Sequence, residues 1–211
     1  MRLIDLVATI AHQLDAAGIP YMLTGSLASS FHGEPRSTRD ADVVIDPTPD
    51  ALRRFVRALA EAEGFDVDAD AALDSLEQRS QFNVIEVATG WKVDFILRKD
   101  RPFSVEEFER RQQVELPGGT IYVATAEDMI IAKLEWALAG ESERQLRDVS
   151  SIASVMGDKL DLEYIDRWVA VLGLGALWTR ARSQWWVRYR LDGRGTIGSW
   201  VVGDSAPSCS G

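Results

Sequence analysis

Apolar residues recur every three or four positions at the start of the chain, at Leu3, Leu6, Val7, Ile10, Leu14 and Ala17. This period predicts an amphipathic helix, which Gly18 would end. A short apolar run over residues 19–23 then predicts a buried strand. Gly25 and Ser26 follow it and predict a tight turn into a second helix that ends near Gly33.

Strand and helix patterns continue to alternate up to about residue 125. Residues 40–46 predict a second strand, and the Thr-Pro pair shortly after them is a typical helix start. Residues 82–87 and 91–97 predict two strands that pair through a Thr-Gly turn. A further strand is predicted over residues 120–124.

Beyond residue 125 the apolar period is helical. Thr125 opens a helix that ends at Gly140, residues 143–156 predict a second helix, and Asp161 caps a third. The sequence therefore predicts an α/β (α+β) fold, in which a mixed sheet flanked by helices is followed by a small helical subdomain.

These patterns divide the chain into three parts. Residues 1–125 are predicted to form the α/β core, and residues 126–182 the helical subdomain. Residues 183–211 have no helical period and become rich in glycine and serine. We expect this atypical tail to be partly disordered.

The composition excludes several classes of protein. A chain of 211 residues with 46% apolar content can bury a core without disulfides or zinc. Its single cysteine, Cys209, rules out a disulfide framework and a cysteine-based zinc site. The longest apolar run, residues 168–178, is too short to span a membrane, and the N-terminus lacks the pattern of a signal peptide. We expect a cytoplasmic protein.

The formal net charge is −10, and the acids are concentrated in the first part of the chain. An acidic run over residues 66–77 is predicted to be a solvated loop or helix end. Residues 151–211 carry 7 bases and 6 acids. This balance argues against a broad nucleic-acid-binding face but leaves room for a confined, salt-sensitive RNA contact. A cationic small molecule or a basic protein would be drawn to the acidic part.

Two aspartates at the start of the second predicted strand indicate a metal site. Asp40 and Asp42 are two residues apart, so their side chains point to the same side of a strand. Like charges so close repel each other, and a bound divalent cation removes the conflict. Carboxylate oxygens are ligands that suit Mg²⁺ or Mn²⁺.

Further residues complete a possible phosphoryl-transfer site. Gly25 and Ser26 would place backbone N–H groups and the positive end of a helix dipole toward a phosphate. Asp94 lies between apolar residues of a later strand, where a charged group needs a partner. It is a candidate third metal ligand, or the acceptor of the proton of an attacking hydroxyl.

Gly25-Ser26, the run Arg36-Ser37-Thr38-Arg39-Asp40-Ala41-Asp42 and the single Asp94 together resemble the polymerase-beta-like nucleotidyltransferase superfamily. The Arg-x-Thr-x-Asp-x-Asp form is most similar to its AbiEii-type branch, the toxins of abortive-infection toxin–antitoxin systems. A helical Lys motif at residues 127–133 and the pair Arg147-Asp148 extend the resemblance over residues 15–172. The branch often has two glycines where this chain has Gly25-Ser26, and an acid at the position of Ser151.

The resemblance implies roles for individual residues. Lys133 would be a cation for the NTP triphosphate, or else the buried partner of Asp148. Asp148 would support catalysis or the structure. Arg36 would contact the nucleotide or order the loop before Asp40, and ordering is the favoured role for Thr38.

The leading hypothesis is a metal-dependent nucleotidyltransferase that binds an NTP such as ATP, moves its NMP to a hydroxyl acceptor and releases pyrophosphate. The family implies RNA or tRNA, or a protein, as the acceptor, and a cognate antitoxin as a partner. One alternative is transfer to a small molecule such as an aminoglycoside. Another is a module that binds a nucleotide or a partner without turnover.

Overall fold

The structure is a computed structural model that describes residues 3–35, 37–116, 119–140 and 142–191. Within these residues, the strands form a seven-stranded mixed sheet in the order β3-β4-β5-β2-β1-β7-β6. The pairs β1–β7 and β2–β5 are parallel, and the other neighbours are antiparallel. The strands are β1 (Tyr21–Thr24), β2 (Asp40–Ile45), β3 (Phe65–Val67), β4 (Gln81–Glu86), β5 (Trp91–Leu97), β6 (Gln112–Leu116) and β7 (Gly119–Val123).

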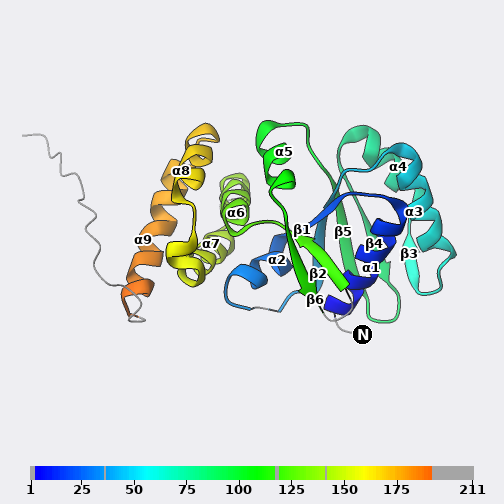
Figure 1. Cartoon of the computed structure of the whole chain (residues 1–211), viewed down its shortest axis with the longest axis horizontal. Coiled ribbons are helices and arrows are strands. Elements are labelled where there is room, and N and C mark those ends of the chain that lie inside the picture. Colours follow the sequence, from blue (N-terminus) through cyan, green and yellow to red (C-terminus); the bar gives the residue numbers. More distant parts are fainter. Residues whose placement is uncertain (1–2, 36, 117–118, 141, 192–211) are drawn as a thin grey trace, which may run out of the picture.

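Helices pack against both faces of this sheet (Figure 1). One face carries α1 (Leu3–Ala17), α3 (Pro49–Glu61) and α4 (Ala69–Gln78). The other face carries α2 (Gly25–His32), against which α6 (Ala126–Gly140) packs. The sheet is therefore the middle layer, and alternate residues of each strand point toward different helices.

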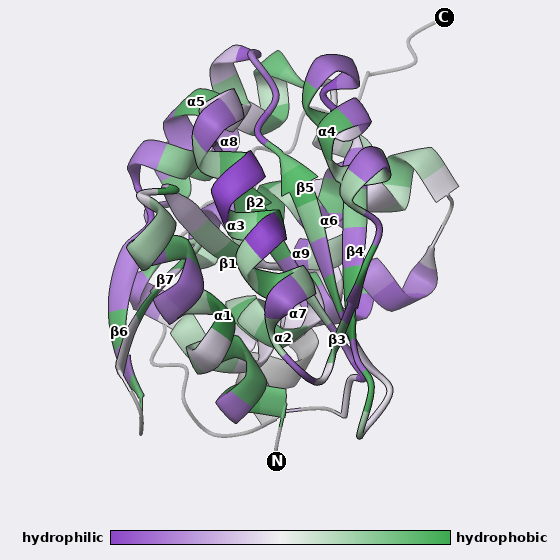
Figure 2. Cartoon of the chain, turned by 90° about the vertical axis from the view of Figure 1, so that its right-hand side faces the viewer, coloured by the Kyte–Doolittle hydropathy of each residue, from purple (hydrophilic) through white to green (hydrophobic). Residues whose placement is uncertain are grey.

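Aromatic residues fill the layer between the sheet and α3. The ring of Phe95 on β5 lies 5.3 Å from that of Phe55 on α3 and 5.0 Å from that of Phe82 on β4. Burying a side chain of this kind contributes about 1.5–3 kcal/mol. Figure 2 shows the apolar strands behind helices whose outer turns are hydrophilic.

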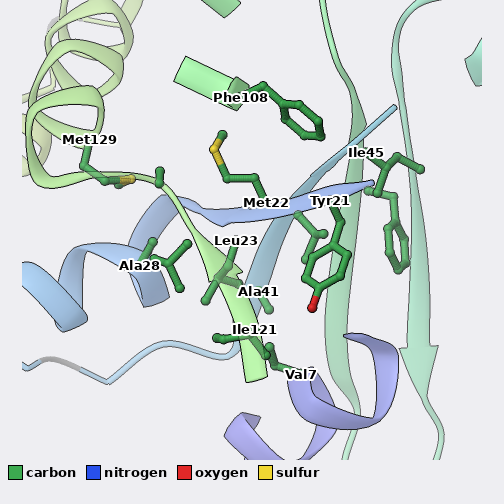
Figure 3. Close-up of a cluster of buried hydrophobic side chains, with 14 of the residues drawn as sticks. Val7, Tyr21, Met22, Leu23, Ala28, Ala41, Ile45, Phe108, Ile121 and Met129 are labelled. Atoms are coloured by element: carbon green, nitrogen blue, oxygen red, sulfur yellow. The ribbon is translucent and has the colours of Figure 1, made fainter. Parts of the chain in front are cut away.

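The opposite layer is built in the same way. In Figure 3, Met22 of β1 points toward Phe108 of α5 (Pro102–Glu109), while Tyr21 points to the other side of the strand. Both are buried, and so is Met129 at the start of α6. Successive side chains of β1 thus point to opposite faces of the sheet, and this short strand contributes to both layers of the core.

The helices after residue 125 pack beside the sheet. They are α6, α7 (Glu143–Met156), a short 3-10 helix (Gly157–Lys159), α8 (Leu162–Val171) and α9 (Gly175–Leu191). Among the described residues, no helix is long and apolar enough to cross a membrane.

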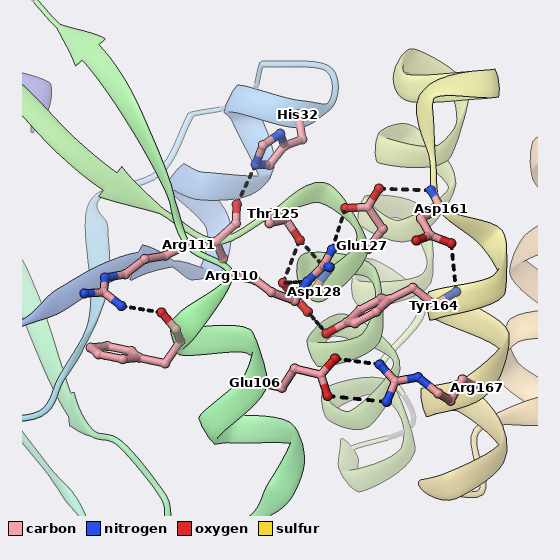
Figure 4. A network of polar contacts seen from close by, with 12 residues as sticks. His32, Glu106, Arg110, Arg111, Thr125, Glu127, Asp128, Asp161, Tyr164 and Arg167 are labelled. Carbon is pink, nitrogen blue, oxygen red and sulfur yellow. Dashed lines mark hydrogen bonds and ion pairs between the residues drawn. The ribbon is translucent and has the colours of Figure 1, made fainter.

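A buried polar network ties α5, α6 and α8 together (Figure 4). Asp128 of α6 is fully buried and accepts hydrogen bonds from Thr125 at 2.6 Å and from the Tyr164 hydroxyl at 2.5 Å. Arg110 donates to the same carboxylate at 3.2 Å, and its guanidinium lies 3.8 Å from the centre of the Tyr164 ring. A buried carboxylate with several donors holds the elements that supply them in one arrangement.

The predicted fold class is confirmed, and most predicted elements lie within a few residues of their expected bounds. The acidic run differs, because residues 65–67 form β3 and residues 69–78 form α4. Asp66 is exposed on β3, whereas Asp68 caps α4 by accepting from the Ala71 amide at 3.0 Å, and the later acids of the run lie on the outer face of this helix.

The predicted division into core, helical subdomain and tail stays a prediction. Its boundary at residue 183 falls inside α9, which runs to Leu191. Helical structure therefore continues past the point where the apolar period is lost, because α7 and α8 pack against this helix. The rest of the proposed tail, residues 192–211, lies outside the described residues.

Candidate functional site

The turn after β1 brings the backbone of Gly25 against the carboxylate of Asp42. Gly25 has a φ of +66°, and a Cβ at this position would lie 1.8 Å from Oδ2 of Asp42. Glycine is therefore required twice, for its left-handed conformation and for the missing Cβ. The backbone amide of Ser26, in the first turn of α2, donates a hydrogen bond to Asp42. The amino end of a helix thus faces this carboxylate.

The strand register places a second carboxylate beside the first. Asp42 of β2 is aligned with Asp94 of the parallel strand β5, and with Thr24 at the end of β1. Asp40 lies two residues before Asp42 on the same side of β2, aligned with Lys92. Three carboxylates therefore share one face of the sheet, at the end where β1 turns into α2.

The carboxylates on this face repel each other. Burial raises the pKa of Asp42, and the nearby charge of Asp94 raises it further. The ammonium of Lys133 and the Ser26 amide act in the opposite direction. Lys92 forms an ion pair with Asp94, with 2.8 Å between Nζ and Oδ2.

The predicted metal ligands are aligned on neighbouring strands but do not form a closed cluster. Within the part of the chain that the structure describes, no three His, Cys, Asp or Glu side chains are gathered closely enough to hold a metal ion. The ammonium of Lys92 instead contacts Asp94, the predicted third ligand. Sequence reasoning did not assign this lysine, although its place two residues before Asp94 puts it on the same face.

Lys133 and Asp148 form a buried ion pair between α6 and α7. The distance from Nζ to Oδ2 is 2.9 Å, and only 5% and 9% of the two side chains are exposed. This contact matches the structural alternative for Lys133. The positive charge of Lys133 also lowers the pKa of Asp42. The lysine therefore acts on the aspartate face, the face of the sheet that carries Asp40, Asp42 and Asp94.

The remaining predicted residues surround the loop between α2 and β2. The Thr38 hydroxyl donates to the Asp40 carbonyl at 3.1 Å and accepts from the Asp40 amide at 3.4 Å, which is the ordering role favoured for it. Arg36 lies outside the described residues. Ser151 of α7 accepts from the Glu34 amide at 2.8 Å and so attaches the end of α2 to the helical part.

His32 ties the end of α2 to the backbone before α6. It is half-buried at the end of α2, and its Nε2 lies 2.7 Å from the Ala124 carbonyl oxygen. This contact joins α2 to the segment that leads into α6, as Figure 4 shows. The tertiary packing of α2 gives the histidine a backbone partner that its sequence neighbours do not reveal.

A cavity of about 230 Å³ opens at the other end of β1, where Tyr21 begins the strand. Its walls include Asp15 of α1, Arg111 and Tyr122. It is smaller than the usual range for ligand pockets, about 300–1,000 Å³. The aspartate face is identified by charge and strand register rather than by the size of a cavity.

Comparisons with known proteins agree with this arrangement. The family model described as nucleotidyl transferase AbiEii toxin of type IV toxin–antitoxin systems matches residues 11–171. No curated protein matches the sequence.

A solved structure shares the fold at low sequence identity. The crystal structure of ANT(2")-Ia in complex with adenylyl-2"-tobramycin has a TM-score of 0.51 at 14% identity, and the match covers 84% of this chain and 98% of that one. An antigenic nucleotidyltransferase-like protein from Paracoccidioides brasiliensis has a TM-score of 0.49 at 15% identity, with coverage of 82% and 90%. The chain therefore belongs to the AbiEii toxin family, and it is a nucleotidyltransferase with the polymerase-beta-like fold.

Proposed function

We propose that this enzyme transfers an NMP from an NTP to a hydroxyl acceptor, with Mg²⁺ or Mn²⁺ held by Asp40, Asp42 and Asp94. The observation that carries the proposal is the alignment of Asp42 with Asp94 directly beside the Gly25 turn. The donors are carboxylate oxygens, which suit these ions. A Cβ at Gly25 would collide with the Asp42 carboxylate, so the glycine is what allows this carboxylate to lie against the turn.

The chain's own residues would bind and orient the nucleotide. Gly25 and Ser26, at the amino end of α2, would hold the β- and γ-phosphates, with the Ser26 hydroxyl as a donor. Arg36 is a further candidate contact for the nucleotide. A bound divalent ion would stabilise charge on the phosphoryl oxygens and on the leaving pyrophosphate.

In the proposed reaction the acceptor oxygen forms a bond to the α-phosphorus, and the bond from the α-phosphorus to the bridging α–β oxygen breaks. Pyrophosphate leaves with that oxygen. Asp94 would accept the proton of the attacking hydroxyl. Positioning of the two reactants supplies most of what the protein contributes.

The proposed acceptor is a hydroxyl group of RNA, tRNA or a protein. We propose that the enzyme acts as the toxin of a toxin–antitoxin pair. It would act in the cytoplasm, where NTP is supplied. Family membership supports this role. A cationic small molecule is the second candidate, favoured by the net charge of −10. Here the solved complex of ANT(2")-Ia with an adenylylated tobramycin offers a parallel.

Incubation with each labelled NTP, Mg²⁺ and separate pools of RNA, protein and aminoglycosides is expected to label one pool and release pyrophosphate. The D40A/D42A variant should give no label, because it lacks two proposed ligands. Asp50→Ala is a matched control, because this aspartate lies on the exposed first turn of α3. Mg²⁺-dependent NTP binding without label in any pool would favour a binding module instead.

Replacing Gly25 with alanine is expected to reduce transfer about a hundredfold, because the new Cβ displaces Asp42 from its place. Gly18→Ala is a sharp control. Gly18 has a similar φ of +71°, but a Cβ there meets no atom within 4 Å. Both variants should lose about 1 kcal/mol of unfolding free energy from the left-handed backbone. Equal activity of the two variants, measured by pyrophosphate release, would argue against the Gly25–Asp42 contact as part of the site.

A further inference from the structure

Lys92 is a cation placed among the three proposed metal ligands. It lies on β5 two residues before Asp94, and its Nζ contacts the Asp94 carboxylate at 2.8 Å. The register of the parallel pair aligns Lys92 with Asp40 on β2, one strand away. The lysine and all three carboxylates therefore share one face of the sheet.

The surrounding charges favour a charged Lys92. Its Nζ contacts the Asp94 carboxylate, and Asp40 and Asp42 lie on the neighbouring strand β2 with their side chains on the same face. Lys92 therefore shares this face with all three carboxylates, not only with its ion-pair partner. It offsets part of the repulsion that the clustered carboxylates exert on Asp42.

The two partners of this ion pair differ in how far their side chains are exposed to solvent. The Asp94 side chain is 15% exposed, while that of Lys92 is 37% exposed. The carboxylate is held by the strand and its neighbours, whereas the long lysine stem reaches solvent. The ammonium is therefore the partner that can leave with little cost in packing.

We propose that Lys92 is an internal counter-cation, which occupies the aspartate cluster in the metal-free enzyme and gives up Asp94 when a divalent ion binds. The ion and the ammonium compete for the same carboxylate oxygens. Lys92 thereby stabilises the metal-free fold and weakens the binding of the divalent ion. This inference rests on the proposed metal-dependent function and adds a residue that regulates its ion affinity.

The test measures binding of Mn²⁺ alone, without nucleotide, from the loss of the free-ion signal in electron paramagnetic resonance. Lys92→Met keeps much of the stem but removes the charge, and is expected to bind Mn²⁺ about tenfold more tightly than wild type, because a unit positive charge is lost beside a ligand oxygen. Lys92→Arg keeps the charge and should stay within about threefold of wild type. Lys159→Met, which removes an exposed lysine of the short 3-10 helix, controls for the change in net charge.

Thermal unfolding gives a second readout that does not depend on activity. Without metal, Lys92→Met should unfold at a lower temperature than wild type, because the carboxylates then repel each other without a counter-charge. Saturating Mn²⁺ should raise its unfolding temperature more than that of wild type, because tighter binding stabilises the folded state more.

The outcomes separate this inference from the proposed function. If wild type binds Mn²⁺, Asp42→Asn does not, and Lys92→Met binds no more tightly than wild type, the counter-cation role is wrong and the metal site stands. If Lys92→Arg tightens binding as much as Lys92→Met, the effect is not one of charge and the inference is also overturned. If no form binds Mn²⁺ saturably, the metal site itself fails, and the inference with it.

Discussion

Asp42→Asn is expected to abolish nucleotidyl transfer without unfolding the enzyme. Asp42 is the one proposed ligand that contacts both halves of the site, since the Ser26 amide donates to it and Asp94 is aligned with it on β5. Asparagine has nearly the same shape but lacks the charge that a divalent ion requires. We expect a loss of transfer of about a thousandfold or more, measured by pyrophosphate release at saturating NTP.

The same substitution should leave the metal-free fold as stable as wild type, or slightly more stable, at pH 7. Burial and Asp94 raise the pKa of Asp42 in the folded state, so the ionised carboxylate costs folding free energy at neutral pH. The advantage of asparagine should fade as the pH falls through this raised pKa toward the ordinary value of a carboxyl group, because Asp42 is then protonated in the wild type too. Chemical denaturation at several pH values without metal measures this trend.

Asp66→Asn is the matched control, because this exposed aspartate lies on β3 at the far edge of the sheet. It should leave transfer unchanged. If Asp42→Asn kept most of its activity, Asp42 would have no essential part in the reaction. If the variant lost both activity and folded structure, as judged by circular dichroism, Asp42 would be a structural residue first.

Lys133→Met is expected to destabilise the fold by about 3–5 kcal/mol, the usual range when one partner of a buried ion pair is removed. Asp148 keeps a buried carboxylate that has lost this ammonium, and the two side chains are only 5% and 9% exposed. The loss should be seen as a lower midpoint of urea unfolding. Asp148→Asn should be destabilising as well, because the buried ammonium of Lys133 then loses the negative charge of Asp148.

The double variant K133M/D148L distinguishes the two roles considered for Lys133. Replacing both partners with apolar side chains removes the buried charge together with its ion-pair partner, so most of the lost stability should return. If Lys133 also contacts the triphosphate, the KM for NTP stays raised in this stable double variant. Recovery of both stability and KM would show that the lysine serves only the ion pair between α6 and α7.

The elements that carry the site could be predicted from sequence because their signals are local. The period of α1, the Thr-Pro start of α3 and the apolar runs of β2 and β5 depend on residues close together in the chain. The short elements β3 and β6 and the helix α5 were not predicted. The partner of β3 is β4, which follows only after the helix α4, and β6 is an edge strand with no buried residue, so its apolar pattern is weak. The helix α9 continues to Leu191, past the point where the apolar period is lost.

The sequence by itself determined the family and the candidate residues of the proposed chemistry, through the parity of Asp40 and Asp42 on one strand, the glycine of the turn and the order of the motifs. Only the tertiary structure decided which groups meet. Strand register aligned Asp42 with Asp94, packing of α7 on α6 paired Lys133 with Asp148, and Lys92 entered the aspartate face. The physical reason is that the conformation of a helix or strand follows the propensities of its own residues. Charge pairing depends instead on contacts between segments far apart in the chain, and the local pattern of residues does not show which segments meet.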